Sequence, residues 1–113
     1  MSVVLQRQFD YYNRRYFGNK LKRIPVHWYR KPQRRYKMTR KSWLDIAGRT
    51  YYRDGHPSQI WLHWKLRKCP NYAKIVLLHE MSHAALPYRI VHGPKFQQQM
   101  MKLAKKCAFK ELW

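Results

Sequence analysis

The segment of residues 72–85 constrains the fold of this chain more than any other. It is apolar on nearly every side, and Pro87 ends it. A helix of this kind is buried on all faces, so we expect it at the centre of a domain. Three polar side chains, His79, Glu80 and His83, interrupt its second half. Since burying an unpartnered carboxylate is strongly unfavourable, Glu80 in particular requires a partner.

A metal ion would supply that partner. His79 and His83 are four residues apart, so they lie on one face of a helix and can bind the same ion. Glu80 is rotated by about 100° from His79, which favours contact with a water molecule on the ion over contact with the ion. The His-Glu-x-x-His arrangement is that of zinc peptidases. A random chain of this composition would contain it roughly 0.01 times.

A catalytic zinc ion keeps three protein ligands and one open position, so a third ligand must come from elsewhere. Two candidates follow the helix, His92 and Glu111. His92 stands just before Gly93-Pro94, where a short loop would turn its imidazole back to the ion. Glu111 lies two residues from Trp113, where fraying is expected. We therefore favour His92.

Helical and strand patterns fill the rest of the chain. Apolar residues recur at helical spacing over residues 5–16 and alternate as in half-buried strands over residues 24–29 and 58–64. We expect another strand over residues 42–52 and a C-terminal helix after Gly93. The order of these elements predicts an α+β fold with a small, mostly antiparallel sheet of about three strands. An extended substrate would pair with the strand that precedes the central helix.

Four local signals predict turns and helix ends. Asp54-Gly55 indicates a hairpin turn. Gly48 indicates a bulge, and Asn71 is the candidate N-cap of the central helix. Gly18 is placed to end the first helix.

The chain is strongly basic. Its 113 residues include 25 Lys and Arg against 5 Asp and Glu, a net charge of +20, whereas about 2–8 keeps a small domain soluble. Hydrophobic residues make up 45%, too much for a disordered tail, and the length suits a single domain over residues 1–113. The charge predicts binding to DNA, and a tyrosine in the densest basic stretch favours single strands or junctions. The candidate contacts are Arg30, Lys31, Arg34, Arg35, Tyr36, Lys37, Arg40 and Lys41.

The sequence also predicts where in the cell the protein is found. No apolar run approaches the roughly 20 residues of a membrane span, and the first residues lack the pattern of a secretory signal. Cys69 and Cys107 form no CxxC pair, and free thiols suit a reducing compartment. We expect a cytoplasmic, nucleoid-associated monomer that is not secreted and binds no membrane.

Motifs in a fixed order extend over nearly the whole chain. His79-Glu80-Met81-Ser82-His83-Ala84 is followed by His92-Gly93-Pro94-Lys95-Phe96, and the N-terminal half contains Tyr12-Asn13-x-x-Tyr16-Phe17-Gly18-x-x-Leu21, Val26-x-Trp28 and Ile60-Trp61-Leu62-His63. This set resembles the SprT-like metallopeptidases, which include the Spartan proteases.

The resemblance implies a minimal zincin-like domain with peptidase activity. Zinc would be bound by His79, His83 and His92, and Glu80 would be the catalytic base. In Spartan members the substrates are proteins crosslinked to DNA, and DNA stimulates cleavage. Two features depart from the family: no four-cysteine zinc ribbon follows within the sequence, and the linker from His83 to His92 is short.

Two other functions stay open at this point. One is a non-catalytic nucleic-acid-binding protein that keeps zinc as a structural element. Closed structural sites normally use four, cysteine-rich ligands, which argues against it. The other is a basic architectural or RNA-binding domain without metal.

Overall fold

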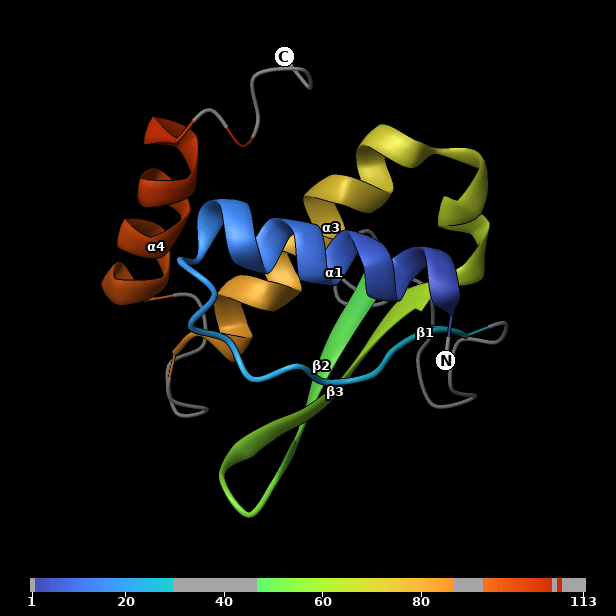
Figure 1. Ribbon diagram of the computed structural model, residues 1–113, viewed down its shortest axis with the longest axis horizontal. Coiled ribbons are helices and arrows are strands. Elements are labelled where there is room, and N and C mark those ends of the chain that lie inside the picture. Colours follow the sequence, from blue (N-terminus) through green and yellow to red (C-terminus); the bar gives the residue numbers. More distant parts are fainter. Residues whose placement is uncertain (1, 30–46, 87–92, 107, 109–113) are drawn as a thin grey trace.

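In the part of the chain that the structure describes, three α-helices, a three-stranded sheet and a short 3-10 helix form an α+β fold, as predicted (Figure 1). The computed structural model describes residues 2–29, 47–86, 93–106 and 108. The elements are α1 (Val3–Tyr16), β1 (Val26–Tyr29), β2 (Gly48–Arg53), β3 (His56–His63), η1 (Trp64–Lys68), α3 (Pro70–Ala84) and α4 (Pro94–Lys105).

The sheet has the strand order β1-β3-β2. β2 runs antiparallel to β3, with Gly48 opposite Leu62, and β1 runs parallel to β3, with Val26 opposite Ile60. The sheet is thus mixed, where we expected it to be mostly antiparallel. A parallel pair requires a long connection between its strands, and the chain between β1 and β3 supplies one. Over residues 60–62, β3 is paired with β1 as well as with β2, so the expectation that a substrate strand adds to this part of β3 is wrong.

The hairpin between β2 and β3 turns at Asp54-Gly55, as predicted. Asp54 has a φ of 53° and Gly55 a φ of 78°. Two consecutive left-handed residues form the type I′ turn, whose twist matches that of the two strands. The irregular register lies between Tyr51 and Tyr52, so the prediction of a bulge at Gly48 is wrong.

Two buried amide side chains of α1 form hydrogen bonds with the segment that leads into β1. Gln6 donates from Nε2 to the carbonyl of Ile24 (3.1 Å) and accepts at Oε1 from the N–H of Val26 (3.2 Å). Asn13 donates to the carbonyl of Leu21 (2.8 Å) and accepts from its N–H (3.1 Å). These bonds satisfy backbone groups that would otherwise be buried without partners.

The predicted end of α1 is confirmed, whereas the predicted N-cap of α3 is wrong. Gly18 follows α1 with a φ of +61°, the left-handed conformation that ends a helix. α3 begins at Pro70, with Cys69 as N-cap, so the prediction of Asn71 as N-cap is wrong. Proline is favoured at the first helical position because its φ is fixed and it has no N–H to satisfy.

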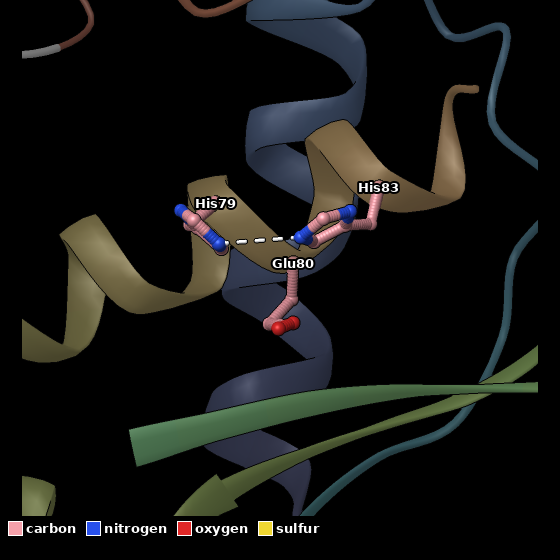
Figure 2. Close-up of side chains that lie close together, drawn as sticks. All are labelled: His79, Glu80 and His83. Atoms are coloured by element: carbon pink, nitrogen blue, oxygen red, sulfur yellow. Dashed lines mark hydrogen bonds between the residues drawn. The ribbon is translucent and has the colours of Figure 1, made fainter. Parts of the chain in front are cut away.

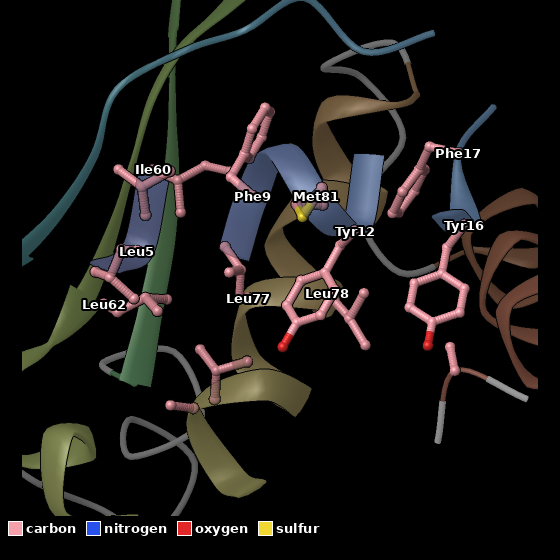
Figure 3. Packing of buried hydrophobic residues seen from close by; sticks show 14 of the residues in the cluster. Leu5, Phe9, Tyr12, Tyr16, Phe17, Ile60, Leu62, Leu77, Leu78 and Met81 are labelled. Carbon is pink, nitrogen blue, oxygen red and sulfur yellow. The ribbon is translucent and has the colours of Figure 1, made fainter. Parts of the chain in front are cut away.

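The core lies between α1, α3 and one face of the sheet (Figure 3). Fully buried residues come from all three elements: Phe9 from α1, Leu62 from β3, and Leu77, Leu78 and Met81 from α3. As predicted, α3 is the central helix. No helix in the described part of the chain is long and apolar enough to cross a membrane.

α3 approaches the sheet most closely at Gly48. A Cβ atom at this position would lie 2.5 Å from Cγ1 of Val76, 3.1 Å from Cγ of Glu80 and 3.1 Å from Cδ2 of Leu62. Glycine is therefore required here by the approach of the helix.

We expect Gly48→Ala to lower the free energy of unfolding by about 1–3 kcal/mol, because the added methyl group overpacks the contact between β2 and α3. Urea denaturation followed by circular dichroism measures this change. Gly93→Ala is the control, since a Cβ there meets nothing within 4 Å. Gly93 is the N-cap of α4, so we expect a change below about 1 kcal/mol. Equal effects of the two substitutions would contradict the packing argument.

Candidate metal centre

The second half of α3 brings His79, Glu80 and His83 together. One ligand atom from each residue lies within 4.8 Å of the other two. The Nε2 atoms of His79 and His83 are 3.2 Å apart (Figure 2). The two imidazoles thus point toward each other from successive turns of the helix, as their spacing predicts.

The distance between the two Nε2 atoms fits a shared metal ion. Two ligands at about 2.05 Å from a zinc ion, separated by the tetrahedral angle, are about 3.3 Å apart. The observed 3.2 Å is close to this value. Without an ion the same distance suits an N–H···N hydrogen bond.

Phe96 fixes the orientation of both imidazoles. Its ring centroid lies 4.5 Å from that of His83 at an interplanar angle of 30°, and 4.9 Å from that of His79 at 60°. Phe96 is buried near the start of α4. The sequence pattern assigns it to the apolar stripe of that helix. Its place in the His-Gly-x-x-Phe element was the signal that could have placed it at the histidines.

Strand β2 supplies two polar contacts that the sequence analysis missed. The hydroxyl of Thr50 lies 3.1 Å from the carbonyl oxygen of Glu80 and 3.3 Å from its Oε2. The hydroxyl of Tyr52 donates to the carbonyl of His83 (3.0 Å). Residues two apart on a strand share a face, so both side chains point toward α3, and Figure 2 shows Glu80 pointing toward the strands.

Burial and the charge of Glu80 raise the pKa of two nearby tyrosines. Burial, followed by the charge of Glu80, raises the pKa of Tyr52. Burial, Tyr51 and Glu80 together raise the pKa of Tyr29 to about 12, against the opposite effect of Arg49. At neutral pH the Tyr52 hydroxyl therefore remains a hydrogen-bond donor to the end of α3.

His56 and His63 do not belong to the His-Glu-His group. His56 is exposed beside the hairpin turn, as expected from its position. His63 is buried, and its Nδ1 accepts from the N–H of Lys65 (3.2 Å). His63 thus caps η1.

Several predicted site residues lie outside the described residues. His92 and its alternative Glu111 are among them, so the third ligand stays a prediction. The candidate DNA contacts also lie outside: Arg30, Lys31, Arg34, Arg35, Tyr36, Lys37, Arg40 and Lys41.

The fold and the His-Glu-His group on α3 fit a zincin-like domain of the metallopeptidase type that holds a metal ion. The SprT-like family model matches residues 5–111, nearly the whole chain. The chain therefore belongs to the SprT-like family. No curated protein and no solved structure matches it.

We expect His83→Ala to reduce bound metal from about one ion per chain to well below one, because it removes one of the paired ligands. Elemental analysis of untagged protein measures the content. His56→Ala is the matched control, since His56 is exposed and distant in sequence from α3. Retention of metal by the His83 variant would contradict the site.

Proposed function

We propose that the protein is a zinc-dependent endopeptidase that cleaves proteins bound or crosslinked to DNA. The observation that carries the proposal is the pair of imidazole nitrogens 3.2 Å apart next to a buried carboxylate. Family membership supports the peptidase class. The net charge of +20 supports the DNA-bound substrates.

Three histidines would hold the zinc ion in this proposal: His79, His83 and His92. When bound, zinc acts as a Lewis acid that activates water and polarises a peptide carbonyl. Phe96 restrains the His79 and His83 rings by its contacts with both. This restraint keeps the ligands oriented before metal binding.

Glu80 would act as general base. Its carboxylate takes a proton from the attacking water and passes the proton to the leaving amine. The Thr50 hydroxyl, 3.3 Å from Oε2, orients the carboxylate. Tyr52 holds the last turn of α3 through the carbonyl of His83. β2 thus positions both the base and one of the ligands.

The substrate would bind as an extended strand beside β2. β2 contacts α3 at Glu80 and His83, and among the described strands it pairs only with β3, on one side. Main-chain hydrogen bonds to a sheet edge carry little information on side chains. Sequence selectivity would then be low, and attachment to DNA would restrict cleavage to nearby proteins.

DNA binding would begin with contacts to phosphates. Arg30 to Lys41 include the densest basic stretch of the chain. With about six phosphates neutralised, the logarithm of affinity falls with the logarithm of salt concentration with a slope of about −5 on duplex DNA and about −4 on a single strand. DNA binding of this kind would place the protein in the cytoplasm, in association with the nucleoid.

We expect Glu80→Gln to reduce cleavage of a DNA-tethered protein by about 100-fold or more, the usual contribution of a general base. Metal content should stay the same, because the histidines are unchanged. A gel-based cleavage assay with elemental analysis measures both.

Asp54→Asn is the control for loss of a carboxylate, since Asn-Gly also suits the hairpin turn. If the Gln variant cleaves as fast as the parent, Glu80 is not the base. If the parent binds zinc and DNA but cleaves nothing, a non-catalytic DNA-binding protein with structural zinc replaces the proposal.

We expect His92→Ala to lower zinc content and Glu111→Ala to leave it unchanged, because three protein ligands are needed for a catalytic ion. Titration with a zinc-sensitive dye measures the affinities of the two variants. The opposite result would assign the third ligand to Glu111.

A further inference from the structure

Two adjoining hollows lie along α1. The first, of about 860 Å³, lies between α1 and the start of α3. The second, of about 560 Å³, lies between the end of α1, the hairpin tip and α4. Tyr16 and Lys106 line both hollows. We call the two hollows together the α1 track.

The α1 track is lined by cations along its length. The first hollow has Arg7, Arg15, Lys74 and Lys106, and the second adds Lys20, Lys22 and Lys102. No acidic residue lines either hollow in the described part of the chain. Clustered cations repel one another, and a polyanion that neutralises them releases its own counterions, which drives binding.

The acidic residue of α1 does not offset this charge. Asp10 pairs with Nε of Arg23 at 3.1 Å and lines neither hollow. Its carboxylate is therefore neutralised outside the α1 track.

An exposed tyrosine stands between two of these cations. Arg7, Tyr11 and Arg15 occur at intervals of four residues, so they share one face of α1 over about 12 Å. Tyr11 is 47% exposed and lines the first hollow. An aromatic ring between cations suits stacking of an unpaired base whose phosphates contact the flanking side chains.

The floor of the first hollow holds Lys74 in place. Its Nζ lies 5.6 Å from the ring centroid of Tyr12 and 5.9 Å from that of Tyr16. Both rings are buried, and Figure 3 shows their hydroxyl ends pointing the same way from α1. These cation–π contacts favour a position of the ammonium group at the hollow, so less conformational entropy is lost when a phosphate binds.

The first hollow lies away from the paired imidazoles. Lys74 and His83 are nine residues apart on α3, which places them about 180° apart around the helix. A ligand in the first hollow would therefore leave the face with His79 and His83 open to a protein substrate. The second hollow is lined by Ala84 and Ala85, which directly follow His83, so the α1 track ends close to the C-terminal end of α3.

We propose that the α1 track binds one single strand of DNA, with phosphates on its cations and a base on Tyr11. The inference rests on the DNA-directed part of the proposed function and is independent of the catalytic part. A concave surface with a stacking ring suits a flexible single strand, whereas duplex DNA is stiff and its bases are already stacked.

The test is binding of fluorescent oligodeoxythymidylate of about 15 nucleotides, a length near the upper end of single-strand site sizes, followed by fluorescence anisotropy. At about 0.15 M salt the Debye length is about 8 Å, so charges outside the contact are largely screened. Arg7→Glu with Lys102→Glu reverses one exposed charge in each hollow. We expect affinity to fall about tenfold or more and the salt slope to become shallower by about 1.4, the loss of two phosphate contacts.

Lys65→Glu with Lys68→Glu is the matched control, because it changes the net charge equally at exposed positions of η1. We expect less than about a twofold change and an unaltered salt slope. Equal losses of affinity in the two double variants, or no loss in either, would show that the α1 track is not the DNA-binding site.

Tyr11→Ala tests whether a base stacks on this ring. We expect the oligonucleotide to bind at least about fivefold more weakly to Tyr11→Ala and with unchanged affinity to Tyr11→Trp. Tighter binding of a duplex of the same length, lost in the same variants, would overturn the single-strand assignment. A protein that binds through the α1 track and cleaves nothing would keep this inference and reject the peptidase.

Discussion

The close contact between α3 and β2 is the feature on which the site depends. Gly48 lets the helix approach the strand at Glu80. Two residues further along, Thr50 contacts the backbone and the carboxylate of Glu80, and Tyr52 then reaches the carbonyl of His83. One face of a short strand thus sets the position and the electrostatic surroundings of the helix half that bears the ligands.

The sequence was informative wherever structure follows from local chemistry. The apolar residues on nearly every side of α3 predict a buried helix. The four-residue spacing of His79 and His83 predicts two ligands on one face, because helix geometry alone determines it. Asp54-Gly55 predicts its turn for the same reason, since both residues adopt positive φ readily. Asn71 failed as an N-cap because the neighbouring proline begins the helix.

Features that depend on tertiary packing were beyond a reading of the sequence. A glycine such as Gly48 suits a bulge or a close helix contact equally, and only the position of α3 decides between them. The contacts of Thr50 with Glu80 and of Phe96 with the histidines join separate elements. Strand order is likewise non-local, and this explains why the parallel pairing of β1 was missed.

That parallel pairing also bears on how the chain folds during synthesis. β1 leaves the ribosome well before β3, the strand it pairs with, whereas β2 and β3 are joined by a two-residue turn. The hairpin closes a short loop and forms quickly, while docking of β1 closes a long one and is slower. Gln6 already bonds the residues at the start of β1. These bonds lie on the edge of β1 away from β3, since the carbonyl of Pro25 on the other edge accepts from the N–H of Ile60. The N-terminal helix can therefore cover the outer edge of the nascent strand and leave the inner edge free to pair with β3.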